Sequence, residues 1–288
     1  MFKAYDSSFH QVIDAMDASK KESYYCWACE KPLVLKKGRI IQPHFAHQPK
    51  ENCGDGWSHP SKTKWHQQMQ ALFNTTEKLM EDKETGERHI ADAVYQDIVF
   101  EFQHSQITAE EVQSRTAFYN QQGYRVVWVV DVCKQIDKGS IDSIDTGHVL
   151  FTWKRPYRMF DKLPFLSQPD QVRVALYWEN GGEIDHRKGP QPTDSVGYIG
   201  LVTWYYEEYI KSRWDRENEC YIELPYENRP DMRFFALSNQ HRVNGRDSLI
   251  LDIFSAIDIE AKKYRRMVEE YLEEREQRAM EFRYYCAY

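Results

Sequence analysis

Two acidic residues, Asp92 and Glu101, are spaced so that a β-hairpin would bring them together. They lie in the segment HIADAVYQDIVFEFQHS, where two β-like runs flank the pair Gln96-Asp97. If that pair is a two-residue hairpin loop, Asp92 lies directly opposite Glu101, with the two Cβ atoms roughly 4.5–5.5 Å apart. Gln103 follows two residues after Glu101 and projects from the same face, because side chains alternate along a strand.

This pair of acids predicts a site for a divalent cation. Two carboxylates that face each other on antiparallel strands repel, so the arrangement needs a compensating positive charge. Mg²⁺ supplies that charge, since it is commonly held by one or two carboxylates together with waters and substrate phosphate oxygens. The alternative is a solvated sheet face that carries ordinary acids. The apolar residues on the other face of the hairpin are predicted to pack against a helix: Ala91, Ala93, Tyr95, Ile98, Phe100 and Phe102.

A second set of residues has the spacing of a structural zinc site. The segment YYCWACEKPLVLKKGRIIQPHFAH contains two cysteines and two histidines in close pairs. Two thiolates and two imidazoles in such pairs close a tetrahedral Zn²⁺ site with no open position, so this zinc would stabilise the fold and take no part in catalysis. The alternatives are that Cys53 or His59 replaces one ligand, or that the cysteines are buried apolar residues without a metal. The four predicted ligands are Cys26, Cys29, His44 and His47.

The elements around the acids predict an α/β unit. Apolar residues at helical spacing indicate an amphipathic helix from Ser61 to about Asn74, and a second helix is predicted from Thr108 to Gly123. The continuously apolar run YRVVWVVD, which follows the second helix, is typical of a strand covered on both faces. Helix, hairpin, helix and buried strand therefore succeed one another along the chain.

Beyond residue 150 the patterns are weaker and predict an α+β region. The run VRVALYW is interpreted as a strand, LVTWYYEEYIKSRW as a helix, and residues 257–283 as a long charged terminal helix. The aromatic and basic run FTWKRPYR is compatible with stacking on single-stranded nucleic acid, or with core aromatics beside surface cations. We predict three domains: a zinc-binding module over residues 1–55, a central core over residues 56–150, and this region over residues 151–288.

Composition and charge restrict the class of protein. The chain has 288 residues, of which 41% are hydrophobic and 29% charged, so a packed core is expected and wholesale disorder is not. No run approaches the roughly 20 apolar residues of a membrane span, and the first ten residues do not form a secretory leader. Six dispersed cysteines favour a reducing cytoplasm. The net charge of −7 argues against a general attraction for nucleic acid, but residues 1–80 carry a net positive charge.

Five segments together resemble a known family. The pattern of Asp, then Glu-x-Gln, then His-Ser is similar to the PD-(D/E)XK nuclease core. The residues of the five segments resemble the competence protein CoiA-like family more closely still. The resemblance covers about residues 20–131. Its features, in chain order, are YYCWACEKPL with GRIIQPHFAH, SKTKWH, HIADAVYQDIVFEFQHSQI, Arg115-x3-Tyr119, and GYRVVWVVD.

The resemblance implies a fold and a set of site residues. The expected fold is a restriction-endonuclease-like mixed sheet flanked by helices, behind an N-terminal zinc finger. Asp92 and Glu101 would bind Mg²⁺ or Mn²⁺, and Gln103 would stand where the common pattern has a lysine. A neutral amide can orient the attacking water but supplies no cation. His66 matches a helix histidine that contacts phosphate, moves a proton or only packs. Arg115 reaches phosphate, pairs with Glu101, or forms an exposed salt bridge.

These observations predict a cytoplasmic, metal-dependent nuclease that hydrolyses DNA. The lysines and arginine between the zinc ligand pairs would dock on the DNA backbone by charge, or form a solvated loop: Lys31, Lys36, Lys37 and Arg39. The chief alternative is a non-catalytic DNA-binding accessory factor that works with recombination or DNA-uptake proteins. A third alternative is a zinc-dependent interaction module with an enzyme-like relic core. No membrane partner is expected.

Overall fold

The structure is a computed structural model, and it describes most of the chain. The described residues are 1–9, 11–38, 42–48, 53, 62–145, 150–179, 197–209, 212–223, 231–237 and 241–243, with scattered residues from 266 to 281. They divide into two compact units, Met1–Val127 and Trp128–Tyr288. The domain boundaries predicted at residues 55 and 150 stay predictions. No helix among these residues is long and apolar enough to cross a membrane.

The first unit begins with a small antiparallel sheet. Its strand order is β2-β1-β3-β4-β5. Tyr24 and Phe45 are fully buried between its strands, with ring centroids 4.9 Å apart. The predicted zinc-binding segment is therefore part of a sheet with its own core. The strands are β1 (Lys3–Tyr5), β2 (Val12–Asp14), β3 (Tyr24–Tyr25), β4 (Pro32–Lys36) and β5 (His44–Ala46).

The rest of the first unit is the sheet that carries the two acids, with strands in the order β9-β8-β7-β6. The predicted hairpin is confirmed, because β7 and β8 pair with Tyr95 opposite Ile98. Gln96 takes the positive φ of 53° that a two-residue loop requires. The elements are α1 (Lys64–Gln70), β6 (Thr75–Glu81), β7 (Arg88–Tyr95), β8 (Ile98–Gln103), α2 (Ala109–Gln121) and the start of β9 (Arg125–Asp131).

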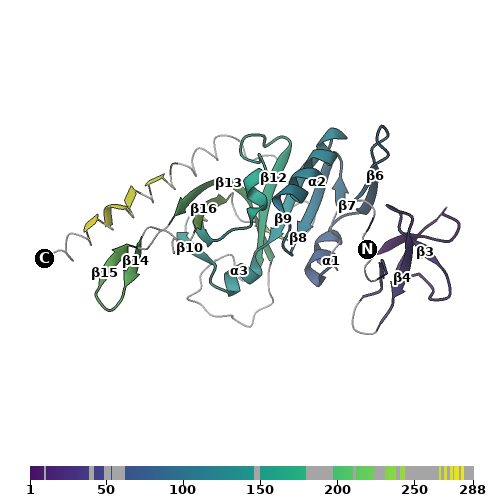
Figure 1. Ribbon diagram of the computed structural model, residues 1–288, viewed down its shortest axis with the longest axis horizontal. Helices are drawn as coiled ribbons and strands as arrows, with labels where there is room; N and C mark the ends of the chain where they lie inside the picture. The colour runs from purple at the N-terminus through teal and green to yellow at the C-terminus, as the bar shows by residue number, and fades with distance from the viewer. Residues whose placement is uncertain are drawn as a thin grey trace. The chain divides into compact units, whose positions relative to one another are not determined.

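A strand–helix–strand unit joins β8 to β9 through α2. Arg125 N–H donates to Asp97 O at 2.8 Å, and the Arg125 guanidinium also pairs with the Asp97 carboxylate. Both contacts lie where the two strands begin, so β8 and β9 run in the same direction, as strands connected by a helix do. The His89 ring of β7 lies 4.4 Å from the Phe118 ring of α2, which places α2 on this sheet (Figure 1).

Both helices of this unit begin at a threonine cap. Thr63 Oγ1 accepts the His66 amide at 3.2 Å and Thr108 Oγ1 accepts the Glu111 amide at 3.1 Å. The first helix is shorter than predicted, since it begins at Lys64 and ends at Gln70. Its apolar face packs as expected on the hairpin. Trp65 contacts Phe102 edge to face, and Phe73, just beyond the helix, lies 4.7 Å from Phe100 between ring centroids.

The second unit is dominated by strands, in the order β10-β11-β16-β13-β12-β9. The predicted buried strand is confirmed as β9, whose residues 126–130 are fully buried. The strand predicted for VRVALYW is confirmed as β12, and the described residues from 266 to 281 are helical, as expected. The elements are α3 (Cys133–Asp137), β10 (Ile141–Asp145), β11 (Leu150–Lys154), η1 (Arg158–Lys162), β12 (Val172–Glu179), β13 (Gly197–Tyr209), β14 (Ser212–Asp215), β15 (Cys220–Glu223), β16 (Asp231–Leu237) and β17 (His241–Arg242).

One predicted element of this unit is wrong, and one open alternative is decided. Residues 201–209 of the run predicted as a helix lie in the strand β13, which pairs with β12 and β16, and residues 212–214 lie in the strand β14. Trp153 is 1% exposed and packs on Phe160 and Phe235, so this aromatic residue belongs to the core and is not a stacking surface. The described residues thus form a mixed α+β fold of large sheets with few helices.

Candidate functional site

Asp92 lies where the ladder between β7 and β8 ends. The pairing runs from Tyr95 opposite Ile98 to Ala93 opposite Phe100. The next amide of β8 that points toward β7, Phe102 N–H, donates to the Asp92 carboxylate at Oδ2 over 3.0 Å. The side chain of Asp92 therefore takes the place of a backbone acceptor, which fixes its carboxylate against the second strand of the hairpin.

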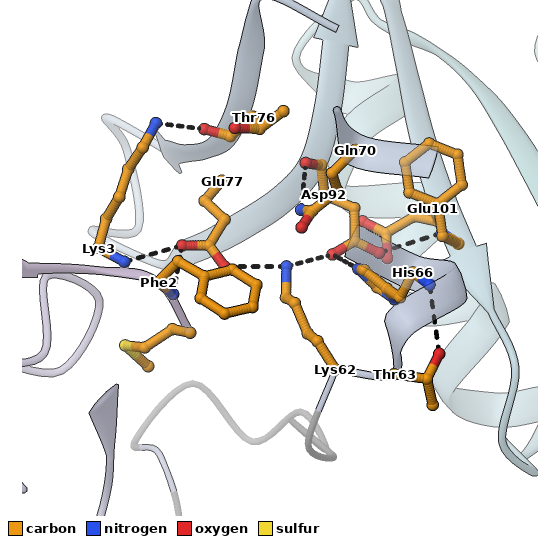
Figure 2. A network of polar contacts seen from close by, with 12 residues as sticks. Phe2, Lys3, Lys62, Thr63, His66, Gln70, Thr76, Glu77, Asp92 and Glu101 are labelled. Carbon is orange, nitrogen blue, oxygen red and sulfur yellow. Dashed lines mark hydrogen bonds and ion pairs between the residues drawn. The ribbon is translucent and has the colours of Figure 1, made fainter. Parts of the chain in front are cut away.

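The other carboxylate oxygen of Asp92 accepts from two side chains at the start of α1. Lys62 Nζ lies 3.0 Å from Oδ1, and His66 Nε2 lies 2.9 Å from the same atom (Figure 2). Gln70, one turn further along α1, donates its amide to Asp92 O at 2.7 Å. Burial alone would raise the pKa of Asp92, but the positive charges of His66 and Lys62 lower it well below its usual range. Asp92 is therefore ionised, and Lys62 and His66 both contact its Oδ1 atom.

Glu101 is held from a different element. Its side chain is 2% exposed, and it accepts from Arg115 Nη1 at 3.0 Å and from the Tyr119 hydroxyl at 2.7 Å, both on α2. Burial, together with the negative charge of Asp92, raises the pKa of Glu101 to about 7 in spite of Arg115. The two acids thus interact electrostatically. The pairing of Arg115 with Glu101 is one of the predicted alternatives, and Arg115 is itself buried.

Glu77 adds a third acid to this network. It is 1% exposed, and its φ of +48° falls where the pairing of β6 with β7 skips one residue, between Thr76 and Lys78. Its Oε2 accepts the amides of Phe2 at 2.8 Å and Lys3 at 3.0 Å, while its Oε1 lies 2.9 Å from Lys62 Nζ. Figure 2 shows Lys62 between the Glu77 and Asp92 carboxylates. Burial would raise the pKa of Glu77, yet the charge of Lys62 lowers it.

The predicted site residues are not all brought together. His66 joins Asp92, and Arg115 joins Glu101, whereas Gln103 donates its amide to Ser105 O and lies 3.4 Å from Ser105 Oγ. Sequence reasoning assigned no role to Lys62, although it lies in the SKTKWH segment that carries His66. Its signal was weak, because a lysine ahead of a helix is normally a solvated residue.

The donor set at the two acids suits a hard divalent cation. Asp92 and Glu101 offer carboxylate oxygens, which Mg²⁺ and Mn²⁺ prefer. Burial first, and then the negative charge of Asp92, raise the pKa of Glu101, and a cation bound beside the two acids would lower it. Among the described residues these two acids belong to no larger cluster of metal-binding side chains. The protein would therefore supply at most a few ligands, as is usual for magnesium sites that keep several waters.

Four other side chains meet in the geometry of a zinc site. The ligand atoms of Cys26, Cys29, His47 and Cys53 all lie within 4.8 Å of one another. The Sγ atoms of Cys26 and Cys53 are 3.8 Å apart, and two sulfur ligands at about 2.3 Å from a tetrahedral Zn²⁺ would be separated by about 3.8 Å. A hydrogen bond with Cys53 lowers the pKa of Cys26 to about 6, which favours the metal-binding thiolate. This cluster of three cysteines and one histidine can hold a metal such as zinc.

His44 was wrongly predicted as a ligand, and Cys53 takes its place. His44 lies in β5, and its Nδ1 is 3.0 Å from Gln42 O, whereas His47 Nε2 is 3.8 Å from Cys29 Sγ. Residues three apart in extended chain point to opposite faces, so a His-x-x-His pair on a strand does not converge on one ion. Cys53 had been considered as a substitute ligand. His59, the other substitute, lies outside the described residues.

Comparison with known proteins identifies two domains. Residues 8–55 match the family model of the competence protein CoiA N-terminal domain, and residues 90–177 match that of the competence protein CoiA nuclease-like domain. No curated protein and no solved structure was found to match the chain. The two matches, which follow one another in chain order, support the competence protein CoiA-like family, and residues 90–177 are similar to a nuclease-like domain. The segment with Lys62, His66 and Glu77 lies between the two matched ranges.

Proposed function

We propose that this chain is a cytoplasmic, metal-dependent nuclease that hydrolyses phosphodiester bonds in DNA. The observation that carries the proposal is the pair of acids on one hairpin, with Asp92 partly buried and Glu101 buried, in which burial and the charge of Asp92 raise the pKa of Glu101 to about 7. The match of residues 90–177 to a nuclease-like domain supports it. Asp92 and Glu101 would hold Mg²⁺ or Mn²⁺, which would polarise the scissile phosphate and lower the pKa of a bound water.

The protein's own residues have distinct tasks in this proposal. Arg115 and Tyr119 hold the Glu101 carboxylate from α2, and the Phe102 amide holds that of Asp92. His66 shares a hydrogen bond with Asp92 at 2.9 Å and would hold that carboxylate in place from α1. Gln103, which lies against Ser105, orients the attacking water after its amide turns away from that residue. All of these side chains are at least partly buried, which strengthens their electrostatic action on a bound phosphate.

The N-terminal module would bind one structural Zn²⁺ and assist DNA binding. Cys26, Cys29, His47 and Cys53 would be its four ligands, so no position remains for catalysis. Among the basic residues proposed to dock on DNA, Lys31 and Lys36 are exposed. Lys37 is exposed as well, but its Nζ donates to Met16 O at 2.7 Å and to Ala18 O at 3.1 Å. Arg39 lies outside the described residues.

The second candidate is a non-catalytic DNA-binding accessory factor that works with recombination or DNA-uptake proteins. Two observations favour it. Gln103 is neutral where a nuclease core commonly has a cation, and each carboxylate oxygen of Asp92 and Glu101 already accepts from a protein donor. In this function the acids and cations would stabilise a folded core that binds DNA without cleaving it.

A cleavage assay separates the two functions. Purified, zinc-loaded protein is titrated with Mg²⁺ and Mn²⁺ on linear, circular and single-stranded DNA, beside Asp92→Asn and Glu101→Gln. Asp97→Asn is the matched control, because Asp97 lies on the same hairpin but is exposed. The nuclease proposal predicts metal-dependent cleavage that falls by about 100-fold or more in both site variants and stays within about twofold in the control. DNA binding without cleavage by the wild type would instead establish the accessory function.

A further inference from the structure

We propose that Lys62 is a catalytic cation of this site, and that it supplies to the scissile phosphate the positive charge that Gln103 lacks. The inference rests on the proposed nuclease function and extends it. Lys62 lies ahead of α1, in the stretch between the two matched family ranges. Glu77 is its positioning residue.

The position of Lys62 is fixed by two carboxylates. Its Nζ lies 3.0 Å from Asp92 Oδ1 and 2.9 Å from Glu77 Oε1, and the side chain is only 13% exposed. The Thr63 cap, which begins α1 at the next residue, sets where the Lys62 backbone enters the helix. Nζ also lies 5.9 Å above the centroid of the Phe2 ring. A lysine held at this many points has lost the freedom of a surface side chain.

A purely structural role explains this arrangement poorly. Burying an ammonium group between carboxylates carries a loss of solvation that apolar residues would not incur. An ammonium has three N–H donors, and among the described residues the Asp92 and Glu77 carboxylates engage two of them, which leaves capacity for one phosphate oxygen. Asp92 is also a proposed metal ligand, and a group that contacts a metal-binding carboxylate lies beside the phosphate that the metal binds. Lys62 is therefore placed where the reaction develops negative charge.

In the proposed hydrolysis of the phosphodiester bond, Lys62 acts as a charged ammonium group. In hydrolysis the water oxygen bonds to phosphorus, the bond from phosphorus to the leaving sugar oxygen breaks, and one proton of the water ends on that oxygen. Lys62 neither gains nor loses a proton, and its charge stabilises the additional negative charge on the phosphate oxygens. Its Nζ is paired with the Asp92 and Glu77 carboxylates, which favour the charged ammonium.

Glu77 connects this cation to the N-terminal module. Its Oε2 is held by the Phe2 and Lys3 amides at the start of β1, which leaves Oε1 for Lys62. Lys3 Nζ further donates to Thr76 O at 2.8 Å, so the strand β1 is anchored on both sides of the Glu77 side chain. Glu77 makes no contact with substrate in this proposal and acts only by placing Lys62.

The test compares Lys62 with a lysine two residues away. Lys62→Met and Lys64→Met remove the same charge, but Lys64 is exposed on α1. We expect Lys62→Met to lower kcat for metal-dependent DNA cleavage by about 100-fold or more with KM changed less than about threefold, and Lys64→Met to leave kcat within about twofold. Lys62→Arg, which keeps a cation, should retain at least about tenfold more kcat than Lys62→Met.

A double variant separates catalysis from folding. Lys62→Met leaves Asp92 and Glu77 without their cation, so lost activity alone could reflect a damaged fold. Lys62→Met with Glu77→Gln removes one unpaired acid as well, and thermal melting and DNA affinity should return toward the wild type while kcat stays about 100-fold low. If this folded double variant cleaves at the wild-type rate, Lys62 is structural and the proposal is overturned. A wild type without metal-dependent cleavage would instead refute the nuclease function itself.

Discussion

The raised pKa of Glu101 predicts an unusual dependence of stability on pH, which Glu101→Gln should abolish. The carboxyl has a pKa of about 7 in the folded protein because of burial and of Asp92, against an ordinary value of 4.5. Between these two pH values the folded state binds more protons at this residue than the unfolded chain does. The free energy of unfolding therefore falls as pH rises, and the stability present below about pH 4.5 is lost on passing through pH 7.

The size of the effect follows from the two pKa values. A difference of about 2.5 pH units at roughly 1.4 kcal/mol each corresponds to about 3 kcal/mol between pH 4.5 and pH 8. Glutamine resembles the protonated form of the side chain and still accepts from Arg115 or Tyr119. We therefore expect Glu101→Gln to match the wild type in stability near pH 5 and to exceed it by up to about 3 kcal/mol at pH 8.

The assay is urea unfolding of zinc-loaded protein at pH 5, 6, 7 and 8 in buffer free of other divalent metals. Asp97→Asn is the control, because Arg125 holds the pKa of Asp97 below its usual value and its contribution has the opposite sign. That stability is present above the ordinary pKa and is lost as pH falls. If Glu101→Gln and the wild type keep a constant difference from pH 5 to pH 8, the electrostatic account of Glu101 is wrong.

Three further outcomes follow from the structure. Cys53→Ser should lose most of the bound zinc, measured by mass spectrometry under native conditions, whereas His44→Ala should keep one zinc per chain; the reverse result would restore the ligand set expected from sequence. Thr63→Ala should lower the free energy of unfolding in urea by about 1 kcal/mol, because it removes the helix cap. An unchanged midpoint would show that this cap does not stabilise α1. Phe100→Ala should cost about 3–5 kcal/mol because the ring is fully buried on Phe73, and a loss below about 1 kcal/mol would show that the hairpin is loosely packed.

The hairpin was predictable because local chemistry determines it. Only two residues separate the two alternating runs, so a tight hairpin turn must join the strands. The pairing of Tyr95 with Ile98 follows from that turn. The cluster of three cysteines and one histidine was predictable in part, since Cys26, Cys29 and His47 lie in one segment. Cys53 lies inside the Gly/Pro/polar stretch from Lys50 to Pro60, where no spacing rule singles it out, and His44 was chosen because it pairs with His47, without regard to the strand that carries it.

The remaining errors come from tertiary structure. The run that forms β13 has apolar residues at spacings that suit a helix, but strands on both sides supply backbone partners that outweigh its local preference. No spacing or motif in the sequence indicated a role for Lys62. Its role depends on Asp92 and on Glu77, which lie 30 and 15 residues away in the chain, and only the fold brings these charges together. Sequence spacing identifies residues that share an element, and it does not identify a cation that meets them from another.

The proposed nuclease function requires that Asp92 and Glu101 together bind one divalent cation. The most direct measurement is a titration of zinc-loaded protein with Mn²⁺, in which free Mn²⁺ is followed by electron paramagnetic resonance for the wild type, Asp92→Asn, Glu101→Gln and the exposed control Asp97→Asn. We expect one bound Mn²⁺ per chain in the wild type and in the control, and at least about a tenfold loss of Mn²⁺ affinity in each site variant. Equal Mn²⁺ binding by all four proteins, or none by the wild type, would contradict it.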